Sequence, residues 1–227
     1  MAFINENYIK IDTPKTSLIY KVETVPPEEL FYETFKRYLK PIHYGKKLRD
    51  YDNYEYLSAR DNTKNTSVSC FGNFDKREPM LLIENADGSL VNDFDFVKAE
   101  FTDSLETGDF PSAHTVDKII KITYEDPRCK LRLINYLCTF VDTDAIVSSY
   151  KLENFGQTVK IRKLMSLQCD LNGAVFSLYS FHGDWISERF LEKRKLGTGL
   201  TVNESLSGMS SHEHNPYILL ERERYGD

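Results

Sequence analysis

The feature that most constrains this chain is a regular alternation of short apolar runs and turn residues from about residue 117 onward. The runs recur at intervals of about 10 to 15 residues, a rhythm typical of antiparallel β-sandwiches and barrels. In residues 156–171, polar side chains alternate with an apolar set at Val159, Ile161, Met165, Leu167, Cys169 and Leu171. A period of two places that set on one face of a strand. The sequence therefore predicts a mainly all-β fold of antiparallel strands.

Residues 129–141, CKLRLINYLCTFV, contain a shift in this alternation. Leu131 and Leu133 begin one apolar set, and the set then moves by one residue to Ile134, Tyr136, Cys138 and Phe140. One extra residue in a strand sends every later side chain to the opposite face. The segment is therefore either a strand with a bulge or a strand that is covered on both faces.

Turn-forming residues separate the expected strands. Asp, Asn, Gly and Pro tolerate or preset turn dihedrals, which predicts hairpin-like connections at residues 125–128, 141–144, 153–157 and 170–173. Asp87-Gly88, between two apolar runs, is a strong hairpin signal of the same kind. Two further strands are expected at residues 3–11 and 16–24.

One helix is expected near the N-terminus, at residues 25–41. Pro27 lies near its first position, Glu28 and Glu29 follow in the first turn, and basic residues precede Pro41. This distribution is the one that the helix dipole favours. Residues 45–79 are polar and rich in turn formers, so we expect a long excursion on the surface there.

Composition excludes several classes of function. The formal net charge of −6 argues against a surface that binds nucleic acid. No stretch approaches the roughly 20 apolar residues of a membrane span, and the N-terminus lacks the pattern of a signal peptide. We therefore expect a cytoplasmic protein with no membrane partner. The cysteines are widely spaced without a CxxC pair, which favours buried free thiols at Cys70, Cys129, Cys138 and Cys169.

Two histidines in GMSSHEHNPY, residues 208–217, raise the question of a metal site. His212 and His214 face the same way in an extended segment, but neighbouring Glu213 points oppositely. A metal needs more ligands than that, so a hydrogen-bonded loop whose imidazoles bind backbone carbonyls is the preferred interpretation. A free-standing, metal-dependent enzyme centred on these three residues stays open as an alternative.

For the other candidate catalytic groups, the sequence gives only weak evidence of a catalytic role. The carboxylate pairs Asp93/Asp95, Asp142/Asp144 and Glu221/Glu223 have no spacing that itself indicates acid–base chemistry, because glycosidase carboxylates must lie roughly 5 to 10 Å apart across a bound substrate. We interpret Asp142 and Asp144 as turn formers and the other two pairs as facing solvent. Ser210 and Ser211 precede His212 but lack a nucleophile elbow.

Two stretches of the sequence resemble a known family, both in their residues and in their order and spacing along the chain. FHGDWISER at 181–189 and RKLGTGLTVNESLSGMSSHEHNPYILL at 194–220 are similar to the N-terminal domain of glycoside hydrolase family 36 α-galactosidases. HYGKKL at 43–48 and DGSLVNDFDFV at 87–97 resemble further elements of the same domain. The resemblance spans nearly the whole chain, so residues 1–227 are interpreted as an antiparallel β-sandwich (supersandwich) that ends before its last strands.

The resemblance implies a parent enzyme of which this chain is an incomplete N-terminal domain. In the family, a central (β/α)₈ barrel carries an aspartate nucleophile and an aspartate acid/base, and a C-terminal β-domain follows. The nucleophile comes after a lysine-tryptophan pair, whereas Trp185 here lies between Asp184 and Ile186. The resemblance therefore implies no catalytic residue in this chain, and a parent that hydrolyses α-galactosides such as melibiose and raffinose with retention and without a metal or cofactor.

The resemblance also implies residue roles and partners. A sandwich loop helps to shape a neighbour's sugar pocket in the family's oligomers, and counting from Gly45 places Asp61 where an aspartate binds galactose hydroxyls. A domain or subunit interface is implied for the residues of the two best-matching stretches, Trp185, Arg189, His212, His214 and Asn215. The parent is then a homo-oligomer, usually a tetramer, and uncovered sheet edges could pair the isolated chain into a dimer.

Two further alternatives remain beside the metal-dependent enzyme. Leu206 and Ser207 replace arginines that are common in the family, which is compatible with a divergent member of altered assembly or specificity. A carbohydrate-binding β-sandwich without a hydrolytic role is the main alternative function, and it requires an exposed aromatic platform.

Overall fold

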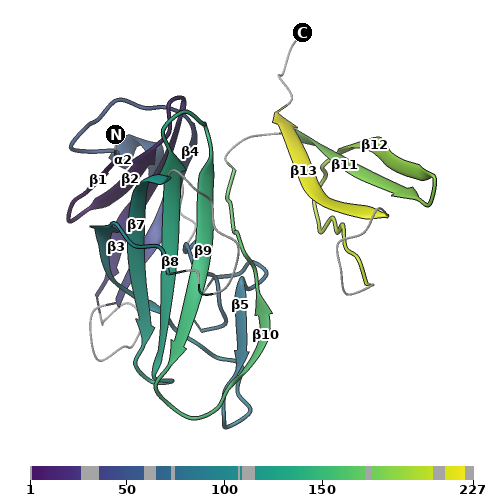
Figure 1. Cartoon of the computed structure of the whole chain (residues 1–227). Coiled ribbons are helices and arrows are strands. Elements are labelled where there is room, and N and C mark those ends of the chain that lie inside the picture. The colour runs from purple at the N-terminus through teal and green to yellow at the C-terminus, as the bar shows by residue number, and fades with distance from the viewer. Residues whose placement is uncertain are drawn as a thin grey trace. The chain divides into compact units, whose positions relative to one another are not determined.

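The computed structural model describes residues 2–26, 36–58, 65–72, 75–106, 108, 116–171, 175–206 and 213–222. These residues belong to two compact units, Met1–Asp170 and Leu171–Asp227, which are described separately here (Figure 1). Both units consist of antiparallel strands, and one short helix is described. The predicted all-β fold class is therefore confirmed.

Two four-stranded sheets form most of the first unit (Figure 1). The first has the order β1-β2-β3-β4, with bounds Ala2–Ile4, Tyr8–Asp12, Thr16–Val25 and Lys36–Lys46. The second has the order β6-β7-β8-β9, with bounds Asp95–Thr102, Val116–Asp126, Leu131–Phe140 and Ile146–Asn154. Strand order follows chain order in both sheets, because each strand is joined to the next by a local connection. The strands expected at 16–24 and 129–141 are present, whereas residues 3–11, expected as one strand, belong to the two antiparallel strands β1 and β2.

One apolar core is shared by the two sheets. Ile9 and Ile11 of β2 and Leu39 of β4 belong to the same buried cluster as Ile120 and Leu133 of the second sheet. Each strand turns alternate side chains toward this layer, as expected for a β-sandwich. Burial of such a side chain contributes about 1.5–3 kcal/mol.

Strand β8 is covered on both faces, which decides between the two interpretations of residues 129–141. Its pairing with β7 and β9 runs without a register shift within the strand's own residues. Leu131 and Leu133 join the shared core, while Ile134 and Tyr136 lie in a separate buried cluster on the other face. The shift in the apolar pattern therefore reflects two covered faces and not a bulge.

The expected helix at 25–41 is wrong over its last part. Lys36–Lys46 is strand β4, which pairs with β3 from Val25↔Lys36 to Thr16↔Lys46. As a strand, the segment buries Leu39 in the shared core and Ile42 in a different cluster, so both faces are used. Residues 27–35 of the expected helix lie outside the described residues. The helix that is described is α2, Glu55–Ser58.

The expected surface excursion at 45–79 is also partly wrong. Tyr54 is fully buried and packs edge-on against Tyr8, with ring centroids 5.4 Å apart. Val68 and Cys70 belong to the shared core. Loop residues of this segment therefore cover the outer face of the first sheet and also enter the shared core. The segment is polar overall, but its few apolar side chains are buried.

The hairpin predictions divide into two groups. Residues 125–128 and 141–144 do connect paired neighbours, β7 to β8 and β8 to β9. Asp87-Gly88 and residues 153–157 form turns between strands that do not pair, because β5 (Leu81–Glu84) and β10 (Lys160–Leu164) pair with each other instead. Residues 170–173 lead from β10 into the second unit and extend beyond the described residues.

Strand β10 is shorter than the alternation at 156–171 predicts. Its pairing with β5 shifts register between Ile161 and Lys163, and Ile161 and Leu167 are exposed. Val159 and Met165 do pack against the shared core. Only part of the predicted apolar face is therefore buried.

The second unit contains a three-stranded sheet of order β12-β11-β13. The bounds are Phe176–Asp184 for β11, Ser187–Lys195 for β12 and His214–Arg222 for β13. Leu178 is the one described hydrophobic residue of this unit that is buried, whereas Phe190, Tyr217 and Leu219 are exposed. Apolar side chains on both faces of this sheet are thus accessible.

The thiols are all free, but their burial differs from the expectation. Cys70 and Cys138 are buried, Cys129 is half-buried and Cys169 is exposed. None of the described helices is long and apolar enough to span a membrane.

Candidate functional site

The two stretches that carry the family resemblance meet on paired strands of the second unit. His182 of β11 is the register partner of His214 of β13. The backbone N–H of Gly183 donates to the carbonyl of Glu213 at 3.3 Å, which fixes the start of β13 beside the end of β11. The described residues of HGDW and of SSHEHNP therefore lie together at strand ends.

A tight connection between β11 and β12 determines the shape of this region. A Cβ on Gly183 would overlap the backbone of Ser187, Glu188 and Arg189, so the close approach requires glycine. The Asp184 carboxylate accepts the N–H of Trp185 at 2.6 Å. Ile186 and Arg189 have left-handed backbone angles, with φ of 68° and 63°. Non-glycine residues with such strained backbone angles are concentrated at functional sites of proteins.

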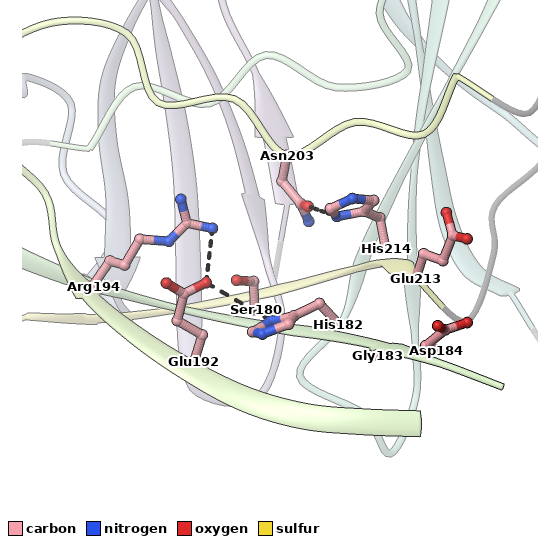
Figure 2. A pocket seen from close by; sticks show the side chains of 9 residues that line it. All are labelled: Ser180, His182, Gly183, Asp184, Glu192, Arg194, Asn203, Glu213 and His214. Carbon is pink, nitrogen blue, oxygen red and sulfur yellow. Dashed lines mark hydrogen bonds and ion pairs between the residues drawn. The ribbon is translucent and has the colours of Figure 1, made fainter. Parts of the chain in front are cut away.

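A cavity of about 440 Å³ opens beside these strand ends, and Figure 2 shows its side chains. Its lining residues come from β11, β12, the start of β13 and the segment between β12 and β13: Ser180, His182, Gly183, Asp184, Glu192, Arg194, Asn203, Glu213 and His214. The volume lies in the range of small-molecule sites.

Glu192 contacts both Arg194 and His182 in the cavity. Its Oε2 lies 3.1 Å from a guanidinium nitrogen of Arg194 and 3.7 Å from Nδ1 of His182 (Figure 2). The second contact is an ion pair only when the imidazole is protonated. Glu192 and Arg194 are two residues apart on one strand, which places both side chains on the same face.

Asn203 fixes the ring of His214. Its Oδ1 lies 3.0 Å from Nδ1 of the imidazole, and its Nδ2 lies 3.5 Å from the carbonyl of Asn215. Because an amide oxygen can only accept, Nδ1 carries the hydrogen of this contact. A backbone carbonyl was the expected partner of this imidazole, and an amide side chain makes the contact.

The interface residues implied by the resemblance have different positions. Trp185 lies in the β11–β12 turn with 78% of its surface exposed, and Arg189 is exposed on β12. His214 lines the cavity and Asn215 follows it on β13. His212 and Asp61 lie outside the described residues. Whether these residues form an interface stays a prediction.

Sequence reasoning did not single out Glu192, Arg194 or Asn203 as members of a site. The alternation in FLEKRK could have placed Glu192 and Arg194 on one face of a strand. Asn203 lies in an irregular segment, where no periodic signal marks it. Within the described part of the chain, no group of three or more potential metal ligands is close enough to hold an ion.

The carboxylate pairs have structural partners. Asp93 and Asp95 were expected to face solvent, but both bind Lys36, at 2.8 and 3.1 Å. Burial raises the pKa of Asp95, although Lys36 opposes this effect. Asp144 accepts hydrogen bonds from Lys15 N–H at 3.0 Å and from the Thr16 hydroxyl at 2.9 Å. It therefore joins the β8–β9 turn to the β2–β3 turn, which is more than the turn-forming role expected of it.

Glu221, of the third carboxylate pair, is bound by its neighbours in the second unit. Its carboxylate lies 3.1 Å from Nζ of Lys193 and accepts the Tyr179 hydroxyl. These contacts lower its pKa, and the Tyr179 contact contributes most. Glu223 lies outside the described residues.

Comparisons with known proteins agree with the resemblance seen in the sequence. The model of the glycosyl hydrolase family 36 N-terminal domain matches residues 37–227. Alpha-galactosidase 2 of Hypocrea jecorina is 30% identical over 155 residues, which cover 66% of this chain and 21% of that protein. Alpha-galactosidase AgaA of Geobacillus stearothermophilus is 26% identical over 156 residues. The chain thus spans about a fifth of the length of these relatives.

Solved structures show the same fold. The alpha-galactosidase from Lactobacillus brevis superposes with a TM-score of 0.82 and 24% identity, over 97% of this chain and 32% of that one. AgaB, a GH36 alpha-galactosidase from Geobacillus stearothermophilus, gives a TM-score of 0.79 and 21% identity, over 98% of this chain and 32% of that one. With the family model matching most of its length, the chain belongs to the glycosyl hydrolase family 36 N-terminal domain family.

Proposed function

We propose that this chain is the non-catalytic N-terminal domain of a retaining α-galactosidase that hydrolyses terminal α-galactosyl residues of oligosaccharides such as melibiose and raffinose. The match of residues 37–227 to the family's N-terminal domain carries this proposal. The part of the chain that matches its relatives covers about a fifth of their length, and these relatives are alpha-galactosidases, which leaves room in the parent for a separate catalytic barrel.

The contacts of the described carboxylates support a non-catalytic role. A retaining glycosidase needs one carboxylic acid and one carboxylate that face each other across the bond to be cleaved. In the cavity of the second unit, Glu192 contacts Arg194 and His182. In the first unit, Asp93 and Asp95 share Lys36. These carboxylates stabilise the domain through ion pairs, which leaves them poorly placed to act on a sugar.

The exposed apolar side chains of the second unit support a scaffold role. Leu191, Tyr217 and Leu219 lie at positions that share one face of the three-stranded sheet, and all three are exposed. An accessible apolar face of this kind favours burial against another part of the protein. We propose that the domain supports the catalytic barrel and the assembly of a cytoplasmic homo-oligomer, a tetramer in the parent.

The third part of the proposal is that the loop carrying Asp61 contributes to a sugar pocket. The described residues that precede it are firmly held: Tyr54 is buried, and its hydroxyl donates to the carbonyl of Arg49 at 2.8 Å. A loop that starts from a rigid anchor loses less conformational entropy when its carboxylate binds a substrate.

Asp61→Ala in the full-length enzyme tests this role. We expect KM for an aryl α-galactoside to rise roughly tenfold or more, because a charged hydrogen-bond acceptor for the sugar is lost. The matched control is Asp52→Ala, an exposed aspartate of the same segment, which we expect to leave KM unchanged. An unchanged KM in Asp61→Ala would remove the loop from the proposal without affecting the rest of it.

A further inference from the structure

A second and larger pocket lies at the turn end of the first unit. Its volume is about 790 Å³, within the range of sites for small molecules. Three segments line it: the turn after β5, the β7–β8 turn and the connection between β9 and β10. The turn after β5 contributes Asn85, Ala86, Asp87, Ser89 and Val91, the β7–β8 turn contributes Arg128, Cys129 and Lys130, and the third segment contributes Phe155, Gly156, Gln157 and Val159. None of the candidate residues discussed above belongs to this pocket.

Hydrogen bonds between the segments hold the pocket in shape. The Phe155 N–H donates to the carbonyl of Lys130 at 2.9 Å, which joins the β9–β10 connection to the β7–β8 turn. The side-chain amide of Asn85 donates to the carbonyl of Val91 at 3.0 Å and closes its own turn. A Cβ on Gly156 would lie 3.0 Å from the carbonyl oxygen of Cys129, so glycine permits this close approach. A preformed pocket binds a ligand at a lower entropic cost.

Phe155 provides an aromatic surface at the pocket. Its side chain is 61% exposed, although burial is the usual state of phenylalanine. The guanidinium of Arg132 lies 5.0 Å from the ring centroid and is itself held by Glu125, so the ring has a fixed support. An exposed aromatic ring is suited to stack on the apolar face of a sugar ring.

Two cations flank this aromatic surface. Arg128 and Lys130 line the pocket and are exposed, and no ion pair is found for either among the described residues. The lining has a single carboxylate, Asp87, which accepts the Ser89 N–H at 2.9 Å. The pocket therefore carries a local excess of positive charge in a chain whose net charge is −6.

The backbone conformation at Lys130 and the neutral thiol of Cys129 are compatible with an anionic ligand in the pocket. Lys130 has a φ of 54°, a left-handed conformation that glycine or asparagine adopts more easily, so a lysine is held there at a conformational cost. Burial, followed by the nearby carboxylate of Asp126, raises the pKa of Cys129 to about 11. The thiol therefore stays neutral and does not repel an anion.

We propose that this pocket binds an anionic carbohydrate, a sugar phosphate, with the sugar ring stacked on Phe155 and the phosphate between Arg128 and Lys130. This proposal goes beyond the α-galactosidase function and does not depend on it. The polar side chain of Gln157 and the small side chain of Ser89 lie where they can meet sugar hydroxyls. Phosphate pairs well with arginine, since its planar guanidinium can donate two parallel hydrogen bonds.

The experiment is a titration of the ¹⁵N-labelled 227-residue protein with glucose 6-phosphate, glucose and inorganic phosphate, followed through the amide signals of residues 128–130 and 155–157. We expect glucose 6-phosphate to bind at least tenfold more tightly than either of the other two, because only it engages both the ring and the cations. We also expect its affinity to fall as salt is added.

Variants separate the two parts of the site. Arg128→Gln with Lys130→Asn removes both charges, and asparagine suits the left-handed backbone at residue 130. We expect this pair to weaken glucose 6-phosphate binding roughly tenfold or more. Phe155→Ala is expected to weaken it about three- to tenfold. Lys76→Ala and Phe101→Ala remove an exposed lysine and an exposed phenylalanine elsewhere in the unit and should change nothing.

Each other outcome overturns the proposal. Equal affinity for inorganic phosphate would make the pocket a general anion site, and equal affinity for glucose would make it a neutral sugar site. Binding that survives both substitutions would place the ligand elsewhere. An absence of signal changes at millimolar glucose 6-phosphate would mean that no such site exists.

Discussion

His182 and His214 occupy paired positions on neighbouring strands, although 31 residues separate them, and each is held by a different partner. Glu192 lies beside His182, and Asn203 binds His214. The register of β11 and β13 therefore brings the two best-matching stretches of the family together. Beside this pair, glycine at 183 permits the close approach of the start of β12 to the end of β11.

Gly183→Ala should destabilise the second unit. An added Cβ meets backbone atoms of Ser187 and Glu188, and backbone cannot move aside as a flexible side chain does. We expect a loss of about 1–3 kcal/mol in unfolding free energy, as for overpacking in a core. Hydrogen exchange at the amides of β11 and β12 measures it. Gly197→Ala is the matched control, because nothing lies within 4 Å of its added Cβ. Equal protection in both variants would contradict the close approach at Gly183.

Both faces of β8 should be sensitive to truncation. Leu133 and Ile134 are neighbours in sequence, and both are buried, in two different clusters. We expect Leu133→Ala and Ile134→Ala each to lower the unfolding free energy by roughly 2–5 kcal/mol, measured by denaturant titration. Val147→Ala on β9, where the residue is 41% exposed, should cost far less. A small loss for either β8 variant would mean that one face of the strand is open to water.

Lys10 forms an ion pair in the interior of the first unit. Its ammonium lies 2.9 Å from Asp12 and also 2.9 Å from the carbonyl of Leu48, and the side chain is fully buried. Lys10→Ala leaves the Asp12 carboxylate buried without this cation, so we expect a loss of about 3–5 kcal/mol by thermal or chemical unfolding. Lys98→Ala removes an exposed ion pair with Glu100 and should cost less than about 1 kcal/mol. Equal losses would show that Lys10 is accessible to water.

Asp75 should contribute to stability in a pH-dependent way. Burial raises the pKa of this carboxyl, but hydrogen bonds from Arg77 and from the Thr66 N–H outweigh burial, and the pKa is lowered overall. A lowered pKa in the folded state means that the stabilisation is present above the ordinary value near 4 and is lost as pH falls through the folded value. Denaturant midpoints measured between pH 7 and pH 2 should therefore fall less steeply for Asp75→Asn than for the wild type. Asp117→Asn, an exposed carboxylate, controls for the loss of one charge. Parallel curves for Asp75→Asn and the wild type would contradict this role.

Local signals in the sequence predicted the parts of the fold that local interactions determine. The hairpins β7–β8 and β8–β9 join neighbours, so their turns and alternation sufficed. Strands β5 and β10 pair through Glu84 and Lys160, 76 residues apart, and no turn signal marks such a distant partner. Residues 36–41, the first part of strand β4, were mistaken for the end of a helix because their charges favour a helix end, whereas pairing with β3 and burial of Leu39 favour the strand.

The sequence predicted only those parts of the candidate site that lie in its two motifs. The order of HGDW and SSHEHNP indicated that His214 belongs with the residues around Trp185, and the register confirms that these stretches meet. Glu192 and Asn203 could not be assigned, since their roles depend on which strand and which irregular segment fold beside the histidines. The exposure of Trp185 in this chain also required the structure, because the resemblance implied an interface role for it and not its accessibility.

The most direct test of the central claim compares turnover of an aryl α-galactoside by the full-length enzyme and by the 227-residue chain at equal molar concentration. The account predicts release of the aryl group by the full-length enzyme and none above the buffer rate by the chain, with circular dichroism confirming that the chain is folded. Turnover by the folded chain alone, or a well-folded full-length protein inactive on α-galactosides, would contradict it.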